Sequence, residues 1–193
     1  PGQTRSRANT SWYEYTYIVS KCSQVFIFPP TNPLGDDARA TQAAPMPDEE
    51  RFFRQMRVSG IGPEGQAALS KSRVLVVGCG ALGSVLASFI VRAGVGTVHL
   101  VDDDWVELSN LYRQILFDQE DALQRRDKAL VVASKLSLVH PFVTVKAHRI
   151  RLLDDNIDAL VGGVDVVVDG TDNFETRYRI NDTCVRLGIP WVY

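Results

Sequence analysis

The feature of this chain that most constrains its fold is a glycine-rich turn between an apolar run and an apolar helical pattern. The run Val74–Val77 precedes the hexapeptide 78–83, whose sequence is Gly-Cys-Gly-Ala-Leu-Gly. In such a turn Gly78 permits a sharp bend, Gly80 lets a phosphate approach the main chain, and Gly83 lets the helix pack close to the strand. The helix start presents unpaired N–H groups and the positive end of its dipole to an anion. The pattern predicts a nucleotide-binding turn, but it indicates neither the nucleotide nor the reaction.

Short apolar runs alternate with helical patterns around this turn. Expected strands cover residues 73–77, 97–101, about 143–147 and 164–168, and a fifth begins at residue 190. Expected helices cover 48–56, 64–70, 127–138 and 155–160, and two more follow the glycine turn and the polar turn 170–172. Strands that alternate with helices form parallel sheets with right-handed crossovers. We therefore expect an α/β fold with a Rossmann-like, doubly wound, mostly parallel sheet, truncated at its C-terminal end.

Two of these segments allow a more detailed prediction. The helix after the glycine turn repeats apolar residues at steps of three and four, namely Leu82, Val85, Leu86, Phe89, Ile90 and Ala93. This spacing predicts that these side chains face the core. The run 164–168 is expected to be a central strand because of its apolar character.

Composition divides the 193 residues at about residue 46. Residues 1–46 are rich in Ser, Thr, Pro and Gly without sustained periodicity, so we expect a disordered or adventitious extension there. Residues 47–193 are expected to form one nucleotide-binding domain. The chain lacks an initiator Met and stops at Tyr193, inside an expected strand, so we expect both ends to be artificial boundaries.

Charge and cysteine content exclude several classes of partner. The net charge is −2 and no strongly basic face is predicted, so neither nucleic acid nor a membrane is expected as a partner. The three cysteines are scattered without a CxxC pair, which fits a reducing compartment. No apolar run approaches the roughly 20 residues needed to span a bilayer. The expected location is the cytoplasm.

Polar residues with a chemical role are expected after the second strand. Asp102 lies about 24 residues after Gly78, close to where an acidic residue binds ribose hydroxyls, although a solvated loop acid has the same pattern. The loop that follows carries Asn110, Arg113 and Gln114, and Lys128 adds a second cation. The glycine turn alone can hold the diphosphate of a nicotinamide cofactor. The extra cationic donors therefore favour a longer polyphosphate.

Asp172, after the fourth strand, brings an anion to the same crevice, because ligands bind at the carboxyl ends of parallel strands. A lone carboxylate repels phosphate, whereas a carboxylate that faces phosphate through Mg²⁺ is favourable. A helix-capping role for Asp172 is the simpler alternative, and the two roles are compatible. Two anions, two cations and a glycine turn fit Mg·ATP better than NAD.

Other reactive residue types are assigned no chemistry. Cys79 is expected to fill space in the turn and Cys184 to lie in the core of a helix. His99 lies in the second expected strand, His140 and His148 are isolated, and none of them pairs with a carboxylate or a Cys at metal-ligand spacing. Lys146, Arg149 and Arg151 are expected to form a solvated face.

Several motifs together resemble one family. They are 51–55 (Arg-Phe-Phe-Arg-Gln), 61–66 (Ile-Gly-Pro-Glu-Gly-Gln), the glycine turn, 101–104 through 109–114, Lys128, and 170–173 with Arg177. From Arg51 to Tyr193 the chain resembles the adenylation domain of the ThiF/MoeB/HesA proteins, relatives of the ubiquitin-activating enzymes. The resemblance covers nearly three quarters of the chain. The ending 189–193 is most similar to the thiamine-synthesis branch, so the thiamine and molybdopterin sulfur-carrier branches are nearest.

The resemblance implies an enzyme, an adenylyltransferase. It would adenylate the C-terminal Gly-Gly carboxylate of a ubiquitin-like sulfur-carrier protein with ATP and Mg²⁺, releasing pyrophosphate. Residues 47–193 would be the incomplete N-terminal part of this ATP-binding adenylation domain. The family also binds Zn²⁺ through CxxC pairs, which would lie after Tyr193 together with a later Cys and the partner-docking surface. Activity of this stretch by itself is therefore not implied.

The resemblance also implies roles for single residues. Amides near Gly80 and Ala81 would contact the phosphates, and Asp102 would hold the ribose. The phosphates would be gripped by Asn110, Arg113 and Lys128, with Ser109 and Gln114 in the same nucleotide-binding loop. Asp172 would bind Mg²⁺, with Asn173 beside the nucleotide. Arg54 would reach into the ATP site of a neighbouring subunit, which implies a homodimer.

Catalysis would then be charge neutralisation and alignment by Arg113, Lys128, Arg54 and Mg²⁺. Two departures from the family pattern stand out. Ala81 replaces the usual glycine but keeps its N–H. The segment 118–127 is about two residues longer than is typical, as loops tolerate.

Three alternatives remain open at this point. An NAD(P)-dependent oxidoreductase needs only the glycine turn and Asp102, and leaves Arg113, Lys128 and Asp172 unexplained. A family relative that activates a tRNA base is the second, and the sequence 109–111 argues mildly against it. The third is a non-catalytic module that keeps the fold for assembly, against which the intact charged set argues.

Overall fold

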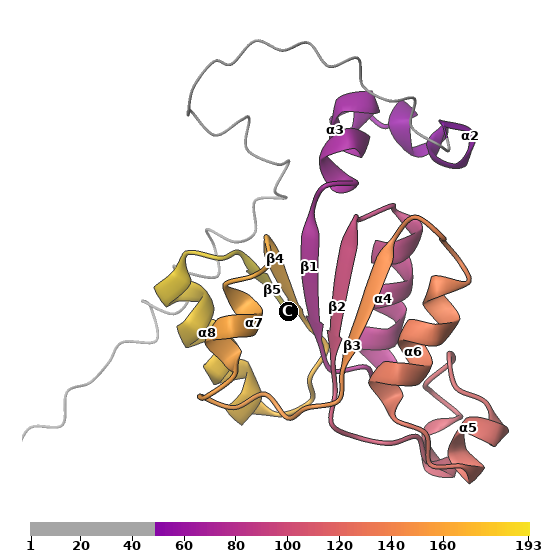
Figure 1. Cartoon of the computed structure of the whole chain (residues 1–193), viewed down its shortest axis with the longest axis vertical. Helices are drawn as coiled ribbons and strands as arrows, with labels where there is room; N and C mark the ends of the chain where they lie inside the picture. The colour runs from indigo at the N-terminus through magenta and orange to yellow at the C-terminus, as the bar shows by residue number, and fades with distance from the viewer. Residues whose placement is uncertain (1–48) are drawn as a thin grey trace, which may run out of the picture.

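The computed structural model of the protein describes residues 49–193, coloured in Figure 1. The expected extension over residues 1–46 and the expected start of the first helix at Asp48 lie outside the described residues. No helix among the described residues is long and apolar enough to cross a membrane.

Five parallel strands form one sheet in the order β3-β2-β1-β4-β5. Their bounds are β1 (Arg73–Val77), β2 (Thr97–Val101), β3 (Thr144–His148), β4 (Val166–Asp169) and β5 (Trp191–Val192). The chain first builds outward from β1 to β3 and then returns to the other side of β1. This confirms the predicted doubly wound α/β fold, and the reversal between β1 and β4 is where such sheets bind ligands.

Helices cover both faces of the sheet, as Figure 1 shows. One face packs against α4 (Ala81–Arg92) and α6 (Lys128–Ser137), and the other against α7 (Ile157–Val161) and α8 (Phe174–Leu187). The strands have apolar side chains on both faces, so each helical layer encloses its own core. Leu75, Val76, Val98, Leu100 and Val167 are completely buried there.

Shorter elements flank these layers. Before β1 lie α2 (Glu49–Phe52), η1 (Gln55–Arg57) and α3 (Gly62–Leu69), and between β2 and α6 lie η2 (Leu108–Asn110) and α5 (Gln119–Leu123). The expected helix over 48–56 is therefore two short pieces. Helix α3 begins before the expected residue 64 because Pro63 fits the first helical turn, where its missing N–H is not needed. The sequence did not predict η2 or α5, which interrupt a polar loop.

The side of α4 that faces the core differs from the expected one. Leu82 and Phe89 are 53% and 66% exposed. The buried residues are instead Gly83, Ser84, Ala87 and Val91. A Cβ at Gly83 would lie only 1.7 Å from the carbonyl oxygen of Gly78, so the helix and the turn are in backbone contact. The helix and the turn are so close that only small side chains fit between them near the start of α4. This contact determines which side of α4 faces the core.

Strand β4 is interior, between β1 and β5, as expected, but it begins at Val166 rather than at residue 164. The expected apolar run contained Asp165, which precedes the strand. The carboxylate of Asp165 accepts a hydrogen bond of 2.7 Å from the backbone N–H of Arg73. Asp165 therefore ties the start of β1 to the start of β4.

The histidines are not isolated, because His140 stacks on Phe52 and His148 contacts His99. Nδ1 of His99, on β2, lies 2.9 Å from Nε2 of His148, on β3, and the two rings stack with centroids 5.2 Å apart. Burial lowers the pKa of both imidazoles, and neighbouring Lys146 lowers them further. Parallel pairing of β2 and β3 brings these distant residues together.

Candidate nucleotide-binding site

A cleft of about 620 Å³ lies at the carboxyl ends of β1, β2 and β4. The strands run downward in Figure 1, so these ends and the loop that carries α5 are at the lower side of the view. Ten of the residues predicted from the sequence line this cleft: Gly78, Gly80, Ala81, Asp102, Asn110, Arg113, Gln114, Lys128, Asp172 and Asn173. Residues from three separate strand ends therefore meet in one place, as the parallel topology requires.

The glycine turn forms the floor between β1 and α4. Gly78 has φ of 85°, a conformation that side chains disfavour, and its N–H donates to the carbonyl of Val101 at 2.8 Å. Gly80 is the N-cap of α4, so the first N–H groups of the helix have no helical acceptor. Gly83 lies outside the cleft lining and permits the backbone contact described above. The turn thus presents backbone donors to an anion in the cleft.

Asp102 is held rigidly at the end of β2. Its carboxylate accepts hydrogen bonds from the backbone N–H groups of Cys79 (2.6 Å) and Asp104 (2.8 Å). Burial raises the pKa of this carboxyl, and the two backbone donors and Lys128 partly offset the rise. An ionised carboxylate has roughly four lone-pair sites. Asp102 can therefore accept further hydrogen bonds from a ligand's hydroxyl groups.

Lys128 and Arg113, the two cations predicted for the cleft, differ in their surroundings. Lys128 is buried at the start of α6, and its Nζ donates to the carboxylate of Asp104 at 2.9 Å. Arg113 is exposed, donates to the carbonyl of Ser109 at 3.1 Å, and lies over the ring of Tyr112. One cation is fixed and the other lies on the exposed rim, and both line the cleft.

The turn between β4 and α8 carries Asp172, an anionic side chain of the cleft. Asn173, not Asp172, caps α8, because its side chain accepts from the N–H of Thr176 at 2.9 Å. The capping alternative for Asp172 is therefore wrong, and its exposed carboxylate lines the cleft. Asp169 fixes the turn by accepting from the N–H and hydroxyl of Thr171 at 2.7 and 2.6 Å.

Arg177 completes this arrangement. Its guanidinium donates to the fully buried carboxylate of Asp169 at 3.0 Å and to the carbonyl of Thr171 at 2.9 Å. In the sequence, Arg177 belongs to a motif of the resemblance but is assigned no role. The structure shows that it braces the turn from which Asp172 projects.

Two predicted residues besides Gly83 do not line the cleft. Arg54 is exposed, between α2 and η1, and Ser109 donates its hydroxyl to the carboxylate of Glu107 at 3.2 Å. Ser109 nevertheless contributes its carbonyl to Arg113.

The cleft also contains residues that the sequence did not point to. The clearest is Arg151, which is exposed, as expected, and also lines the cleft. Arg149, expected on the same face, pairs with Asp127 at 2.8 Å. Arg151 follows the carboxyl end of β3, so the rule that singled out Asp102 and Asp172 would have found it. Trp105, Ile150 and Leu152 supply apolar surface.

The cysteines have the places expected of them. Cys79 and Cys184 are buried, and burial raises the pKa of Cys184 to about 12 and that of Cys79 further. A thiol held in its neutral form is a poor nucleophile. Neither cysteine therefore contributes nucleophilic chemistry in this domain.

Comparison with known proteins shows which proteins this chain is similar to. A model of the ThiF family matches residues 52–193. The sulfur carrier protein adenylyltransferase of Thermus thermophilus is 44% identical over 144 residues, which are 75% of this chain and 52% of that protein. The sulfur carrier protein ThiS adenylyltransferase of Bacillus subtilis is 40% identical over 143 residues, 74% of this chain and 43% of that protein. The chain spans about half the length of these relatives.

Solved structures show the same fold. The tRNA N6-threonylcarbamoyladenosine dehydratase TcdA of E. coli, solved in complex with ATP, is 26% identical with a TM-score of 0.69, covering 74% of this chain and 58% of that one. E. coli MccB, solved with MccA-N7isoASN, is 25% identical with a TM-score of 0.64, covering 73% and 42%.

Proposed function

Because this chain belongs to the ThiF family, we propose that its cleft binds Mg·ATP and adenylates the C-terminal carboxylate of a ubiquitin-like sulfur-carrier protein. One observation carries the proposal. The glycine turn, Asp102, two cations and Asp172, which are far apart in the sequence, line a single cleft. The relatives named as sulfur carrier protein adenylyltransferases, at 40% and 44% identity, support the choice of acceptor.

ATP is the nucleotide that this set of groups fits best. The backbone donors at Gly80 and Ala81 suit one phosphate group, and Asp102 suits the ribose hydroxyls. Arg113 and Lys128 then remain for the rest of a triphosphate, which a dinucleotide lacks. The complex of TcdA with ATP supports this assignment.

Asp172 fits Mg²⁺ by the chemistry of its position. Its carboxylate is exposed on the cleft wall, in a turn that Asp169 and Arg177 hold in place. Mg²⁺ is bound in proteins by one or two carboxylates together with phosphate oxygens and water. When bound, the ion neutralises charge on the phosphates.

The reaction needs no protein nucleophile. A carboxylate oxygen of the carrier's C-terminal Gly-Gly tail forms a bond to the α-phosphorus, and the bond from this phosphorus to the oxygen bridging the α- and β-phosphates breaks. Pyrophosphate leaves with that electron pair. A C-terminal carboxyl has a pKa of about 3.5, so it is already ionised at neutral pH and needs no general base.

Charge neutralisation is then the main task of the site. The attacking carboxylate and the triphosphate are both anions and repel each other. Lys128, fixed by Asp104, and Arg113 counter this repulsion. Preorganised charges of this kind contribute more than mobile ones, because they need no reorganisation during the reaction.

The proposal includes a homodimer. Arg54 lies outside the cleft of its own chain and is exposed, so it is available to a second copy. We expect Arg54→Ala to lower ATP–pyrophosphate exchange. Mixing it with Arg113→Ala should restore exchange if each copy completes the other's site. No recovery in the mixture would contradict a shared site.

The principal experiment is ATP–pyrophosphate exchange by the protein's complete chain, with the sulfur carrier ThiS of Bacillus subtilis as acceptor. Wild type should exchange in the presence of Mg²⁺, and Asp172→Ala should abolish exchange while leaving the far-UV circular dichroism unchanged. The matched control is Asp154→Ala, which removes an exposed aspartate that pairs with Arg179. If Asp172→Ala exchanged at the wild-type rate, the result would contradict the binding of Mg²⁺ by Asp172.

Two measurements separate the alternatives. Calorimetry should detect Mg²⁺-dependent binding of ATP and none of NAD, and the reverse result would favour an oxidoreductase. The structural similarity to TcdA makes a tRNA substrate the second candidate. AMP transfer to tRNA rather than to the carrier would establish that branch.

A further inference from the structure

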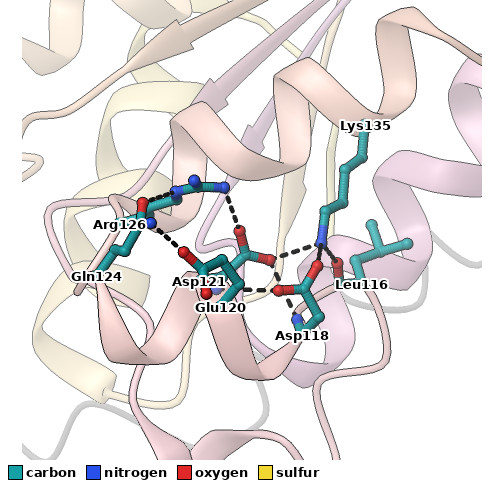
Figure 2. Close-up of polar contacts among 7 residues, drawn as sticks. All are labelled: Leu116, Asp118, Glu120, Asp121, Gln124, Arg126 and Lys135. Carbon is teal, nitrogen blue, oxygen red and sulfur yellow. Dashed lines mark hydrogen bonds and ion pairs between the residues drawn. The ribbon is translucent and has the colours of Figure 1, made fainter.

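A cluster of charged residues joins α6 to the loop before it, outside the cleft (Figure 2). Nζ of Lys135, on α6, donates to three acceptors of the loop. They are the backbone carbonyl of Leu116 at 2.8 Å and the carboxylates of Asp118 at 2.8 Å and Asp121 at 2.6 Å. We call this set of four residues the Lys135 clamp. All three donor positions of the ammonium group are thus used on one segment.

The clamp contains a completely buried carboxylate. Asp121 has no exposed side-chain surface, and its second oxygen accepts from Arg126 at 3.2 Å. Asp118 and Asp121 also cap α5, each accepting from the other's backbone N–H. Removal of one partner of a buried charge is costly, so these residues hold one geometry.

The clamp stays charged over a wide pH range. The hydrogen bond from Lys135 lowers the pKa of the Asp118 carboxyl to about 2. Asp118 and Lys135 are therefore both ionised at every pH at which the enzyme would work.

Two short connections lead from the clamp to the cleft. Lys128 and Lys135 lie seven residues apart on α6, which is about two turns and places them on the same side of the helix. In the loop, the N–H of Phe117 donates to the carbonyl of Gln114, and the N–H groups of Arg113 and Gln114 donate to the carbonyl of Asn110. Consecutive turns thus link the clamp to Arg113.

We propose that Lys135 is a positioning residue that sets the separation of two cations of the cleft, Arg113 and Lys128. Lys135 binds the loop that carries Arg113 to the helix that carries Lys128, so both cations become parts of one rigid unit. This inference rests on the proposed function, because it assigns those cations to the phosphates of ATP. Two of its four residues, Asp118 and Asp121, lie in the segment 118–127.

The test compares two ligands by calorimetry on the complete chain. Lys135→Met should weaken Mg·ATP binding at least tenfold. It should change the affinity for AMP less than threefold, because AMP lacks the β- and γ-phosphates. Lys135→Arg keeps a cation and should restore most of the ATP affinity. The matched control is Lys71→Met, which removes an exposed lysine outside the cleft and the clamp and should bind like wild type.

A double mutant distinguishes positioning from a general loss of structure. In the Arg113→Ala background, Lys135→Met should weaken ATP binding less than threefold further, because its effect passes through Arg113. A full tenfold loss in both backgrounds, or an equal loss for AMP and ATP, would overturn the proposal.

Asp118→Asn covers the case in which Lys135→Met does not fold. Asparagine keeps an oxygen that can cap α5 while losing the charge that pairs with Lys135. It should weaken Mg·ATP binding about threefold, and unchanged affinity would count against the clamp. If wild type itself fails to bind Mg·ATP, the proposed function fails and takes this inference with it. If wild type binds and Lys135→Met binds equally well, only the inference fails.

Discussion

The two walls of the cleft are built by different means. The wall between β1 and β4 consists of the glycine turn and the turn 170–173. Close backbone contacts hold these turns together, and the ion pair of Arg177 with Asp169 braces the second turn. The wall between β2 and α6 consists of the long excursion 102–127, which backbone hydrogen bonds close at its base and side-chain charges hold to the helix. Backbone packing therefore dominates in the first wall, and ion pairs have the larger share in the second.

Steric exclusion in the first wall is severe. A Cβ at Gly170 would lie 2.6 Å from Cα of Gly83, and one at Gly78 would lie 2.9 Å from the carbonyl oxygen of Gly170. Backbone atoms cannot yield as flexible side chains do. Gly78, Gly83 and Gly170 therefore tolerate almost no substitution, whereas a Cβ at Gly80 would meet nothing closer than 3.7 Å.

Backbone hydrogen bonds at its two ends and charged side chains hold the second wall in place. At its base the N–H of Val106 donates to the carbonyl of Arg126, and the N–H of Lys128 donates to the carbonyl of Asp104. Farther out, the Lys135 clamp holds the loop to α6. Apart from the buried Asp121 and its partners, we expect substitutions in this wall to leave the fold intact and to change the ligand affinity instead.

The largest expected effect is therefore in the first wall. Gly83→Ala places a methyl group 1.7 Å from the carbonyl oxygen of Gly78. We expect the free energy of unfolding to fall by about 3 kcal/mol or more, because overpacking against backbone forces the helix away. Urea denaturation measures it.

Gly65→Ala, within α3, is the control for that substitution. Its added Cβ meets nothing closer than 3.4 Å, so we expect a change within about 1 kcal/mol, in the stabilising direction that Ala gives in a helix. Equal stability of the Gly83→Ala and Gly65→Ala variants would show that the first wall is not fixed by shape.

A smaller effect, on affinity instead of folding, is expected in the second wall. Asp102→Asn keeps an oxygen that can accept from Cys79 but loses the charge that favours bonds from ribose hydroxyls. We expect Mg·ATP binding to weaken by about tenfold, or about 1.4 kcal/mol. The fold should remain. The stability at neutral pH should change little, because losing the hydrogen bond from the Asp104 N–H offsets the relief of a carboxylate that burial disfavours in its charged form. Calorimetry and urea denaturation of the same samples test both statements.

The smallest expected effects appear only as a dependence of stability on pH. The lowered pKa of His99 and His148 means that their contribution is present above 6.5, the ordinary value, and is lost as the pH falls below it. We expect stability to decline between pH 6.5 and 5, and less so in His148→Thr. Identical pH profiles of the two proteins would contradict this.

The contribution of Asp118 to stability should also be lost as the pH falls, but at a lower pH. Its pKa is lowered, so its contribution is present above 3.8 and is lost as the pH falls through about 2. The difference in stability between wild type and Asp118→Asn should therefore disappear only in strong acid. A difference that already disappears at pH 5 would show that Lys135 does not hold this carboxylate.

The glycine turn and the strands were predictable because their signals are local. Gly78 follows a run of apolar residues that fit a strand, and the bounds 73–77 and 97–101 agree with β1 and β2. Residues after strand ends could be predicted to meet, since parallel strands bring their carboxyl ends together. Asp102 and Asp172 were found in this way, and Arg151 was overlooked by not applying the same rule to β3.

Other features depend on contacts that no local pattern contains. The periodicity of α4 predicted Leu82 and Phe89 in the core, but the rotation of the helix depends on how closely Gly83 approaches another segment. The capping carboxylates of α5 are neutralised by Lys135, which belongs to a later helix. The pair His99 and His148 likewise requires the alignment of two strands.

The sequence by itself determined the alternation of strands and helices, the phosphate-binding turn and the charged residues available to a ligand. These follow from the conformational preferences of single residues and from the period of apolar side chains. Only the tertiary structure decided which face of α4 is buried, which asparagine or aspartate caps α8, and how the loop before α6 is held. Those choices depend on atoms that are remote along the chain and near in space, where steric contact and the burial of charge select one arrangement.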